Sequence, residues 1–213
     1  MARKTDIHLK KKPKQQRSKV TVDAILEAAT YVLRREGPSK LTTNKVAERA
    51  GVNISSFYQY FPNKEALVFH MVALNWETEF KRLEPILLRP DGNHARNLRD
   101  FIREFFIIEA AEADLRQALR IASVELRHME EFQAVIDRGA DLTRTFLNRA
   151  LSRQTEAERE FAVSFIVRIV TSFGERLTDD RVQGEALLRQ ADLLCEMLIK
   201  QFEIASDPIT DAD

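Results

Sequence analysis

A short stretch of uncharged polar and aromatic side chains stands out between residues 51 and 67, GVNISSFYQYFPNKEAL. Its aromatic residues are Phe57, Tyr58, Tyr60 and Phe61. They cannot all face one side of a helix, because side chains share a helical face only when they lie three or four residues apart. Some must pack in a core and others must face outward. Amide, hydroxyl and phenol groups on an outward face can form hydrogen bonds with the edges of bases in a DNA groove.

Three predicted helices position this stretch. The first follows a cap at Thr21, carries apolar residues at helical spacing and ends at Gly37-Pro38. The second is capped by Thr42 or Thr43. It ends at Gly51, because glycine adopts the left-handed conformation of a tight turn without strain.

The third predicted helix holds the aromatic residues. Asn53 caps it, and it runs from Ile54 to about Tyr60. Two short helices joined by a tight, glycine-containing turn form a helix-turn-helix, which the first helix supports by packing. Because this unit needs a core, Val52, Phe57 and Phe61 are expected to be buried.

The remaining side chains of the third helix are expected on its outer side. Uncharged groups there can enter a DNA major groove and meet base edges or thymine methyl groups. Groups near the helix end can reach phosphates and fix the docking register. A solvated face with two extra core aromatic residues is the alternative. The predicted groove-facing residues are Asn53, Ile54, Ser55, Tyr58 and Gln59, and the predicted phosphate contacts are Tyr60 and Lys64.

The distribution of charge along the chain favours a nucleic-acid partner for its N-terminal end. Residues 1–64 hold 14 Lys or Arg against 5 Asp or Glu, whereas residues 65–213 hold 19 against 28. A formal net charge of +0 therefore conceals two oppositely charged segments. Residues 1–19 form a predicted basic, flexible arm, for which a plain basic tail is the alternative reading.

These residues resemble the TetR (AcrR-like) family of bacterial transcriptional regulators. The resemblance runs through ILEAATYVLRREG and LTTNKVAERAGVNISSFYQYFPNKEAL, about residues 20–70, and beyond them only the helical architecture is similar. It implies a DNA-binding domain at residues 20–65 and an effector-binding and dimerisation domain at residues 66–213. It also adds the second helix to the predicted DNA contacts, at Thr42, Thr43, Asn44 and Lys45.

Helical periodicity continues through the C-terminal segment, and no strand-like alternation persists. The predicted fold class is therefore all-α, with an N-terminal three-helix helix-turn-helix domain and a larger C-terminal helical domain. Asn63 caps a long helix that is expected to end at Pro85, and RPDGN at residues 89–93 is the clearest loop. The helix boundaries between residues 110 and 130 stay open.

The last two predicted helices are apolar over most of their circumference, as in EFAVSFIVRIVTSF at residues 160–173. Such a helix buries more than one side. Pairing with the same two helices of a second copy gives a four-helix interface with twofold symmetry, and the resemblance implies the same arrangement. A well-buried monomer core is the alternative. The predicted interface residues are Val163, Val167, Val170, Leu187, Ala191, Leu194 and Leu198.

The C-terminal segment holds 11 of the 13 Phe residues and the single Trp. Phe at four-residue spacing is most often plain core. The resemblance nevertheless implies a cavity for a small effector, and such pockets are mostly apolar. The candidates to line it are Trp76, Phe80, Phe101, Phe105, Phe106, Phe132 and Phe165.

Other classes of function lack their sequence signatures. The four His residues are scattered without the spacing of a metal pair, and no phosphate loop, nucleophile elbow or Cys–His motif occurs, so we predict no catalytic residue, metal or cofactor. No apolar run approaches the roughly 20 residues that cross a bilayer, and no apolar segment follows the basic N-terminus as in a secretory signal. The single Cys195 fits a reducing compartment. These features predict a cytoplasmic protein without a membrane partner.

The sequence thus predicts a homodimeric, TetR-like repressor that binds double-stranded operator DNA and is released by a small, apolar effector. The alternative is a helix-turn-helix protein that is controlled by a protein partner or that has no effector. The operator sequence, the effector, the regulated genes, and the choice between repression and activation at a given promoter stay open.

Overall fold

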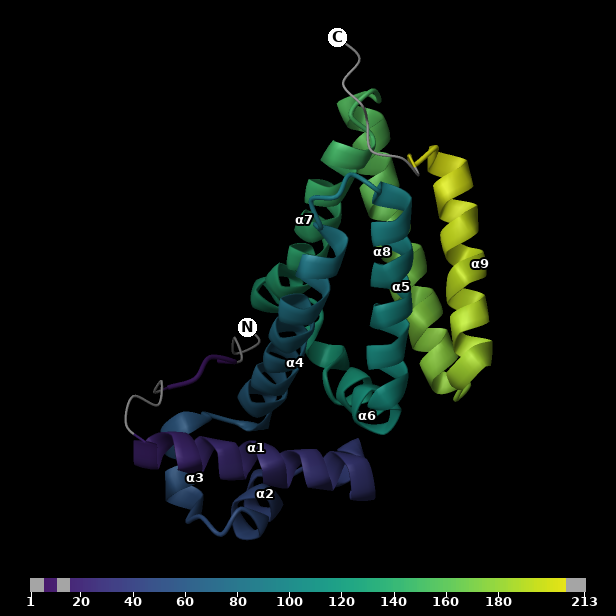
Figure 1. Cartoon of the computed structure of the whole chain (residues 1–213). Helices are drawn as coiled ribbons and strands as arrows, with labels where there is room; N and C mark the ends of the chain where they lie inside the picture. Colours follow the sequence, from purple (N-terminus) through teal and green to yellow (C-terminus); the bar gives the residue numbers. More distant parts are fainter. Residues whose placement is uncertain (1–5, 11–15, 206–213) are drawn as a thin grey trace. The chain divides into compact units, whose positions relative to one another are not determined.

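The computed structural model describes residues 6–10 and 16–205, and every regular element in these two ranges is a helix (Figure 1). The predicted all-α fold class is confirmed. No helix in these ranges is long and apolar enough to cross a membrane. The elements, in chain order, are α1 (Gln16–Glu36), η1 (Pro38–Lys40), α2 (Thr43–Arg49), α3 (Ile54–Tyr60), α4 (Lys64–Leu87), α5 (His94–Ala111), α6 (Ala113–Ala122), η2 (Val124–Leu126), α7 (Glu130–Ala150), α8 (Glu156–Asp179) and α9 (Gly184–Phe202).

The chain divides into two compact units. Unit 1 contains the chain up to Trp76 together with Asp114–Gln133. Unit 2 contains Glu77–Ala113 and the chain from Ala134 onward. Unit 1 therefore includes the helix-turn-helix and nearly all of α6, whereas unit 2 includes α5, α8 and α9. The functional boundary that the sequence analysis places between residues 65 and 66 stays a prediction.

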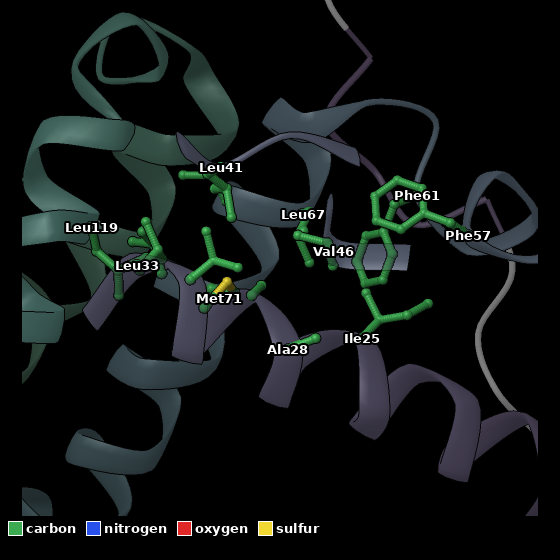
Figure 2. Packing of buried hydrophobic residues seen from close by; sticks show 14 of the residues in the cluster. Ile25, Ala28, Leu33, Leu41, Val46, Phe57, Phe61, Leu67, Met71 and Leu119 are labelled. Atoms are coloured by element: carbon green, nitrogen blue, oxygen red, sulfur yellow. The ribbon is translucent and has the colours of Figure 1, made fainter. Parts of the chain in front are cut away.

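One hydrophobic core holds unit 1 together (Figure 2). Helix α1 turns its apolar stripe inward, so that Ile25 and Val32 are completely buried, and α2, α3 and α4 close the core. Leu119 of α6 packs into the same core, which explains why the segment that returns at Asp114 belongs to this unit. Each large apolar side chain buried in this way contributes about 1.5–3 kcal/mol. Other members of the core are Leu33, Leu41, Val46, Phe57, Phe61, Leu67 and Met71.

The predicted ends of α2 and α3 are confirmed. The Thr42 hydroxyl caps α2 by accepting a hydrogen bond from the Lys45 N–H at 3.3 Å. The Asn53 side chain caps α3 by accepting one from the Ser55 N–H at 3.0 Å. Between the two helices Gly51 has a φ of 66°, a conformation in which a Cβ atom would be strained. The predicted helix-turn-helix is therefore built by the residues that the sequence analysis selected.

Two helix ends differ from the predictions. Helix α1 begins at Gln16, so Thr21 lies inside the helix and does not cap it. The Thr21 hydroxyl instead donates to the Arg17 carbonyl, four residues earlier, at 3.1 Å. Helix α4 continues through Pro85 to Leu87. A proline so close to the end of a helix removes one N–H donor but leaves few following bonds to lose.

The predicted flexible arm also differs at the positions that the structure describes. Residues 16–19 form the first turn of α1, and Ile7 is 1% exposed within the core of unit 1. Ile7 is an apolar residue in a basic segment, and burying it in the core removes its side chain from water. The basic residues Arg3, Lys4, Lys11, Lys12 and Lys14 lie outside the described ranges.

Helix α5 packs against both α8 and α9 in unit 2 (Figure 1). Gly174 of α8 permits close packing, since a Cβ atom there would lie 3.1 Å from the Phe105 ring and 3.2 Å from the Phe106 ring. The Arg103 guanidinium donates two hydrogen bonds of 2.5 Å to the Asp192 carboxylate and so joins α5 to α9. This contact holds the pKa of the Asp192 carboxyl below its usual range.

Candidate functional site

The helix-turn-helix of unit 1 presents a group of uncharged polar side chains to solvent. Phe57 points inward and is completely buried, whereas its neighbour Tyr58 is 41% exposed. This contrast confirms that the aromatic residues of α3 divide between core and surface. The exposed uncharged polar residues of α2, α3 and their caps are Thr42, Asn44, Asn53, Ser55, Tyr58 and Gln59.

A hydrogen bond joins the two helices of the motif at this surface. The Thr43 hydroxyl of α2 lies 3.1 Å from the Tyr58 hydroxyl of α3. The Tyr58 ring also meets the edge of the Phe57 ring, with 5.5 Å between the ring centroids. Each hydroxyl carries one proton, so one proton is used within the pair and one remains to donate outward. The pair thus offers a single, positioned O–H donor.

The cap of α3 decides what its first residues can offer a partner. The Asn53 side-chain oxygen accepts from the Ser55 N–H at 3.0 Å and from the Ser55 hydroxyl at 3.1 Å. The Asn53 side chain is therefore left with its two amide N–H donors, and the Ser55 hydroxyl with its acceptor lone pairs. A donor and an acceptor beside each other suit the mixed pattern of groups on base edges in a major groove.

Two charged contacts fix α2 against α1. The Arg49 guanidinium stacks over the Tyr31 ring, 3.0 Å from its centroid. The Lys45 ammonium forms an ion pair with the Glu36 carboxylate. The sequence analysis assigns Lys45 to DNA, but the structure gives this half-buried residue a partner within the chain. Glu36 lies nine residues earlier, on another helix, so no sequence spacing indicates this pair.

Tyr60 and Ile54 differ from their predicted outward placement. Tyr60 is 8% exposed and belongs to the core of unit 1, because it lies three residues after Phe57 and shares its face of α3. Ile54 is partly buried and packs against the same core. The outward face of α3 is therefore narrower than expected and more polar.

The start of α4 follows closely after α3. The Asn63 side chain caps α4, as predicted, by accepting a hydrogen bond from the Ala66 N–H at 2.7 Å. Lys64 is exposed, and its ammonium lies 3.8 Å from the Glu65 carboxylate. An exposed ammonium at the end of α3 suits the predicted phosphate contact, which stays a prediction.

The residues predicted to line an effector pocket are divided between the two units. Trp76 and Phe132 belong to unit 1. The other five belong to unit 2, where Phe101 and Phe105 stack with 6.5 Å between their ring centroids. Phe165 lies apart from a closed interior, since it is 44% exposed. The pocket itself stays a prediction.

The dimer interface stays a prediction, but the structure shows where its predicted residues lie within one copy of the chain. All except Val167 are buried within unit 2, and two of them, Leu194 and Leu198, also line the hollow described next. The two apolar stripes of α8 look equivalent in the sequence, and the sequence does not show which of them faces α5. The buried residues are Val163, Val170, Leu187, Ala191, Leu194 and Leu198.

A different stripe of α8 and α9 is exposed and apolar. Phe161 is 63% exposed, Leu193 59% and Met197 61%. With Phe165 they border a hollow of about 520 Å³, which we call the α8–α9 groove. Spacings of four residues, Phe161 to Phe165 and Leu193 to Met197, are the sequence signal for this face. The other lining residues are Ile169, Phe173, Gln190, Leu194, Leu198, Gln201 and Phe202.

A tight helix-turn-helix with an exposed polar face is typical of one class of proteins, the helix-turn-helix DNA-binding proteins. Residues 25–71, which contain α2, α3 and the start of α4, match the family model described as bacterial regulatory proteins, tetR family. Over these residues the chain is similar to the TetR family of bacterial transcriptional regulators. The family and its fold are those of DNA-binding regulators rather than of enzymes.

Solved structures share the fold over most of the chain. SmeT, the repressor of the Stenotrophomonas maltophilia multidrug efflux pump SmeDEF, is 21% identical with a TM-score of 0.70, covering 92% of this chain and 98% of SmeT. A SmeT–triclosan complex gives a TM-score of 0.68 at 18% identity, with coverages of 91% and 97%. The fatty acid degradation regulator FadR from Bacillus halodurans is 19% identical with a TM-score of 0.69, covering 91% of this chain and all of FadR.

Curated relatives add a different kind of protein. The nucleoid occlusion factor SlmA of Aliivibrio fischeri is 24% identical over 183 residues, covering 85% of this chain and 79% of SlmA. SlmA of Vibrio vulnificus is 23% identical over the same share.

Proposed function

We propose that this protein is a cytoplasmic repressor that binds operator DNA as a homodimer. The observation that carries the proposal is the exposed polar face of α2 and α3, whose donors and acceptors are held by caps and by the Thr43–Tyr58 bond. A polar face that is fixed before binding loses little freedom on association, which favours specific readout.

Base reading is assigned to the start of α3 and to Asn44. The Asn53 amide donors suit acceptors such as guanine O6 and N7, and the Ser55 lone pairs suit the amino donors of adenine or cytosine. Asn44 is exposed on α2, and its amide can pair with both the donor and the acceptor of adenine.

Phosphate binding is assigned to Lys64 and to the hydroxyls of α2. The Thr42 hydroxyl accepts from the Lys45 N–H, so it keeps its own proton to donate. The Lys64 ammonium is exposed and mobile enough to follow a phosphate as a point charge. Such contacts fix the register of the protein on the duplex but carry no sequence information.

Dimerisation is assigned to the α8–α9 groove. An exposed apolar face of this kind marks a protein-binding surface. A second copy of the chain fits it, because a twofold axis brings the same apolar face onto itself. Two copies would read two half-sites about 34–36 Å apart or a multiple of that distance.

Control by a small apolar molecule is the first candidate for regulation. The fold is shared with SmeT, which has been solved with triclosan. Helix α4 carries Lys64 near its start and Phe80 further along, so a ligand against Phe80 has a helical path to the DNA contacts. A ligand that favours the non-binding arrangement by 1–3 kcal/mol lowers DNA affinity about 5–150-fold.

Control by a protein partner is the second candidate. The similarity to SlmA over 85% of the chain motivates it, because SlmA is named for nucleoid occlusion and not for a small molecule. In this case a protein partner would bind the surface of the large domain, and no small molecule would bind a cavity inside it.

DNA binding is tested by selecting operator sequences from random duplexes. The affinities of two variants for the selected sequences are then compared with those of the wild type. Asn44→Ala should change the preferred sequence by about 1–3 kcal/mol per lost base contact. Lys64→Ala should weaken binding to all sequences alike and lower the slope of affinity against salt by roughly one unit. Absence of any preferred sequence in the wild type would refute operator binding.

The mode of control is tested with triclosan as a probe. Under the first candidate, a triclosan-like apolar molecule raises the melting temperature and lowers operator affinity, and Phe80→Ala reduces both effects while leaving ligand-free DNA affinity nearly intact. A panel of apolar molecules that leaves melting temperature and operator affinity unchanged favours control by a partner.

A further inference from the structure

A segment ahead of the helix-turn-helix is docked on the end of the reading helix α3. In this segment, Asp6–Lys10, the Lys10 N–H donates to the Tyr60 carbonyl at 3.0 Å. The Asn63 side-chain amide donates to the Asp6 carbonyl at 2.8 Å. Both partners lie at the junction of α3 and α4, so the segment is tied at each end to the same corner of unit 1.

Apolar and charged contacts hold the segment between these two bonds. Ile7 is 1% exposed, and Leu9 packs against the same core. The His8 ring nitrogen Nε2 lies 3.5 Å from the Glu131 carboxylate, which also belongs to unit 1. Two hydrogen bonds to its main chain and one fully buried side chain make this five-residue segment an integral part of unit 1.

The docking decides where Lys10 emerges. Its main chain is bonded to the last residue of α3, and its side chain is exposed. Lys64 follows Tyr60 by only four residues and is exposed as well. The same corner also holds carboxylates: Asp6, which accepts from the His8 N–H at 3.1 Å, and Glu65, which lies beside Lys64. Two ammonium groups therefore share the corner at the end of the helix that enters the groove.

We propose that the docked segment is part of the DNA interface and that it positions Lys10 as a phosphate contact beyond the helix-turn-helix. The inference rests on the proposed operator binding. Phosphates border the groove on both sides of an inserted helix, and a side chain at the end of that helix meets them. Lys10 adds to Lys64 there, and its position is set by the Tyr60 and Asn63 bonds rather than by charge alone.

The test measures duplex affinity by fluorescence anisotropy between 50 and 200 mM salt, a range in which each phosphate contact costs about 3.5-fold in affinity. Lys10→Ala should lower the salt slope by about 0.9 and weaken binding to operator and random duplex alike. Lys10→Arg should keep the wild-type slope. Lys200→Ala, which removes an exposed Lys of α9, should leave the slope unchanged.

Positioning is tested by releasing the segment without changing charge. Asn63→Ser keeps a capping oxygen for α4 but removes the amide that holds the Asp6 carbonyl. It should lower the slope as Lys10→Ala does, and the double variant should lower it no further. Ile7→Ala releases the same segment by an independent change, and the melting temperature of each variant checks that the fold is retained.

The outcomes separate the inference from the function beneath it. A wild-type slope in Lys10→Ala overturns the phosphate contact. A lowered slope in Lys10→Ala with wild-type slopes in both Asn63→Ser and Ile7→Ala overturns the positioning by the docked segment. A wild type that binds no duplex DNA refutes the proposed function itself, which is a different result from either.

Discussion

Truncating Met197 should weaken the proposed dimer without weakening the fold of one protomer. Met197 is 61% exposed on the rim of the α8–α9 groove, so most of its side chain is free to be covered by a second copy. Burying a whole side chain of this size contributes about 1.5–3 kcal/mol. Covering the exposed share contributes roughly 1–2 kcal/mol.

Twofold symmetry doubles this contribution, since each protomer presents the same residue. The expected loss for Met197→Ala is therefore about 2–4 kcal/mol per dimer, which corresponds to a dissociation constant about 30- to 700-fold higher. Met197→Glu should have a larger effect, because it places a charge against apolar partners.

The assay is sedimentation velocity over a concentration series, with urea unfolding of the same samples. The matched control is Glu196→Gln, a change at the adjacent, exposed position of α9. Leu187→Ala gives the opposite result, because Leu187 is 4% exposed in the core of unit 2. It should lower the free energy of unfolding by about 2–5 kcal/mol.

Two results would refute this reasoning. One is a dissociation constant for Met197→Glu equal to that of the wild type, which would remove the groove from the interface. The other is a selective loss of dimer in Leu187→Ala with an unchanged protomer, which would restore the stripe predicted from the sequence.

Three further predictions concern contacts inside the protein. Thr43→Val and Tyr58→Phe should each weaken operator binding by about 0.5–1.5 kcal/mol. The double variant should lose no more than the larger single loss, because both changes remove the same hydrogen bond. Strictly additive losses in anisotropy titrations would contradict this. Gly174→Ala should lower the free energy of unfolding by about 1–3 kcal/mol, since its Cβ would press on the Phe105 ring, and an unchanged urea midpoint would argue against that packing. Burial raises the pKa of the Cys195 thiol from 9.0 to about 12, so it should react with a thiol reagent only after unfolding. The stability that comes from burying this neutral thiol is complete below pH 9.0 and is lost as pH rises toward 12, which unfolding measurements against pH would show.

The helix-turn-helix is predictable from sequence because its signals are local. Thr42, Gly51 and Asn53 each act within three residues of their own position, through a cap or a turn. Phe57 and Phe61 are four residues apart, which places both on one helical face. Such features need no knowledge of the rest of the fold.

The parts that sequence reasoning missed depend on distant partners. Lys45 meets Glu36 of another helix, and Ile7 enters a core formed by residues far along the chain. Helix α8 has apolar residues on two neighbouring stripes, and the packing of α8 against other helices decides that Val163 is buried while Phe161 is exposed. Periodicity identifies an apolar face but does not show what will cover it.

The order in which the chain builds unit 1 has a consequence for its synthesis. The segment Asp114–Gln133 supplies Leu119 and Phe132 to the core that begins with α1, yet 37 intervening residues, Glu77–Ala113, belong to unit 2. When the ribosome has released only the helix-turn-helix, the core of unit 1 therefore still lacks the side chains of Asp114–Gln133. Folding of this unit has to wait for the returning segment, and a fragment cut at Trp76 should expose apolar surface and aggregate. A shortened DNA-reading fragment of this protein needs Asp114–Gln133 joined to it through a linker.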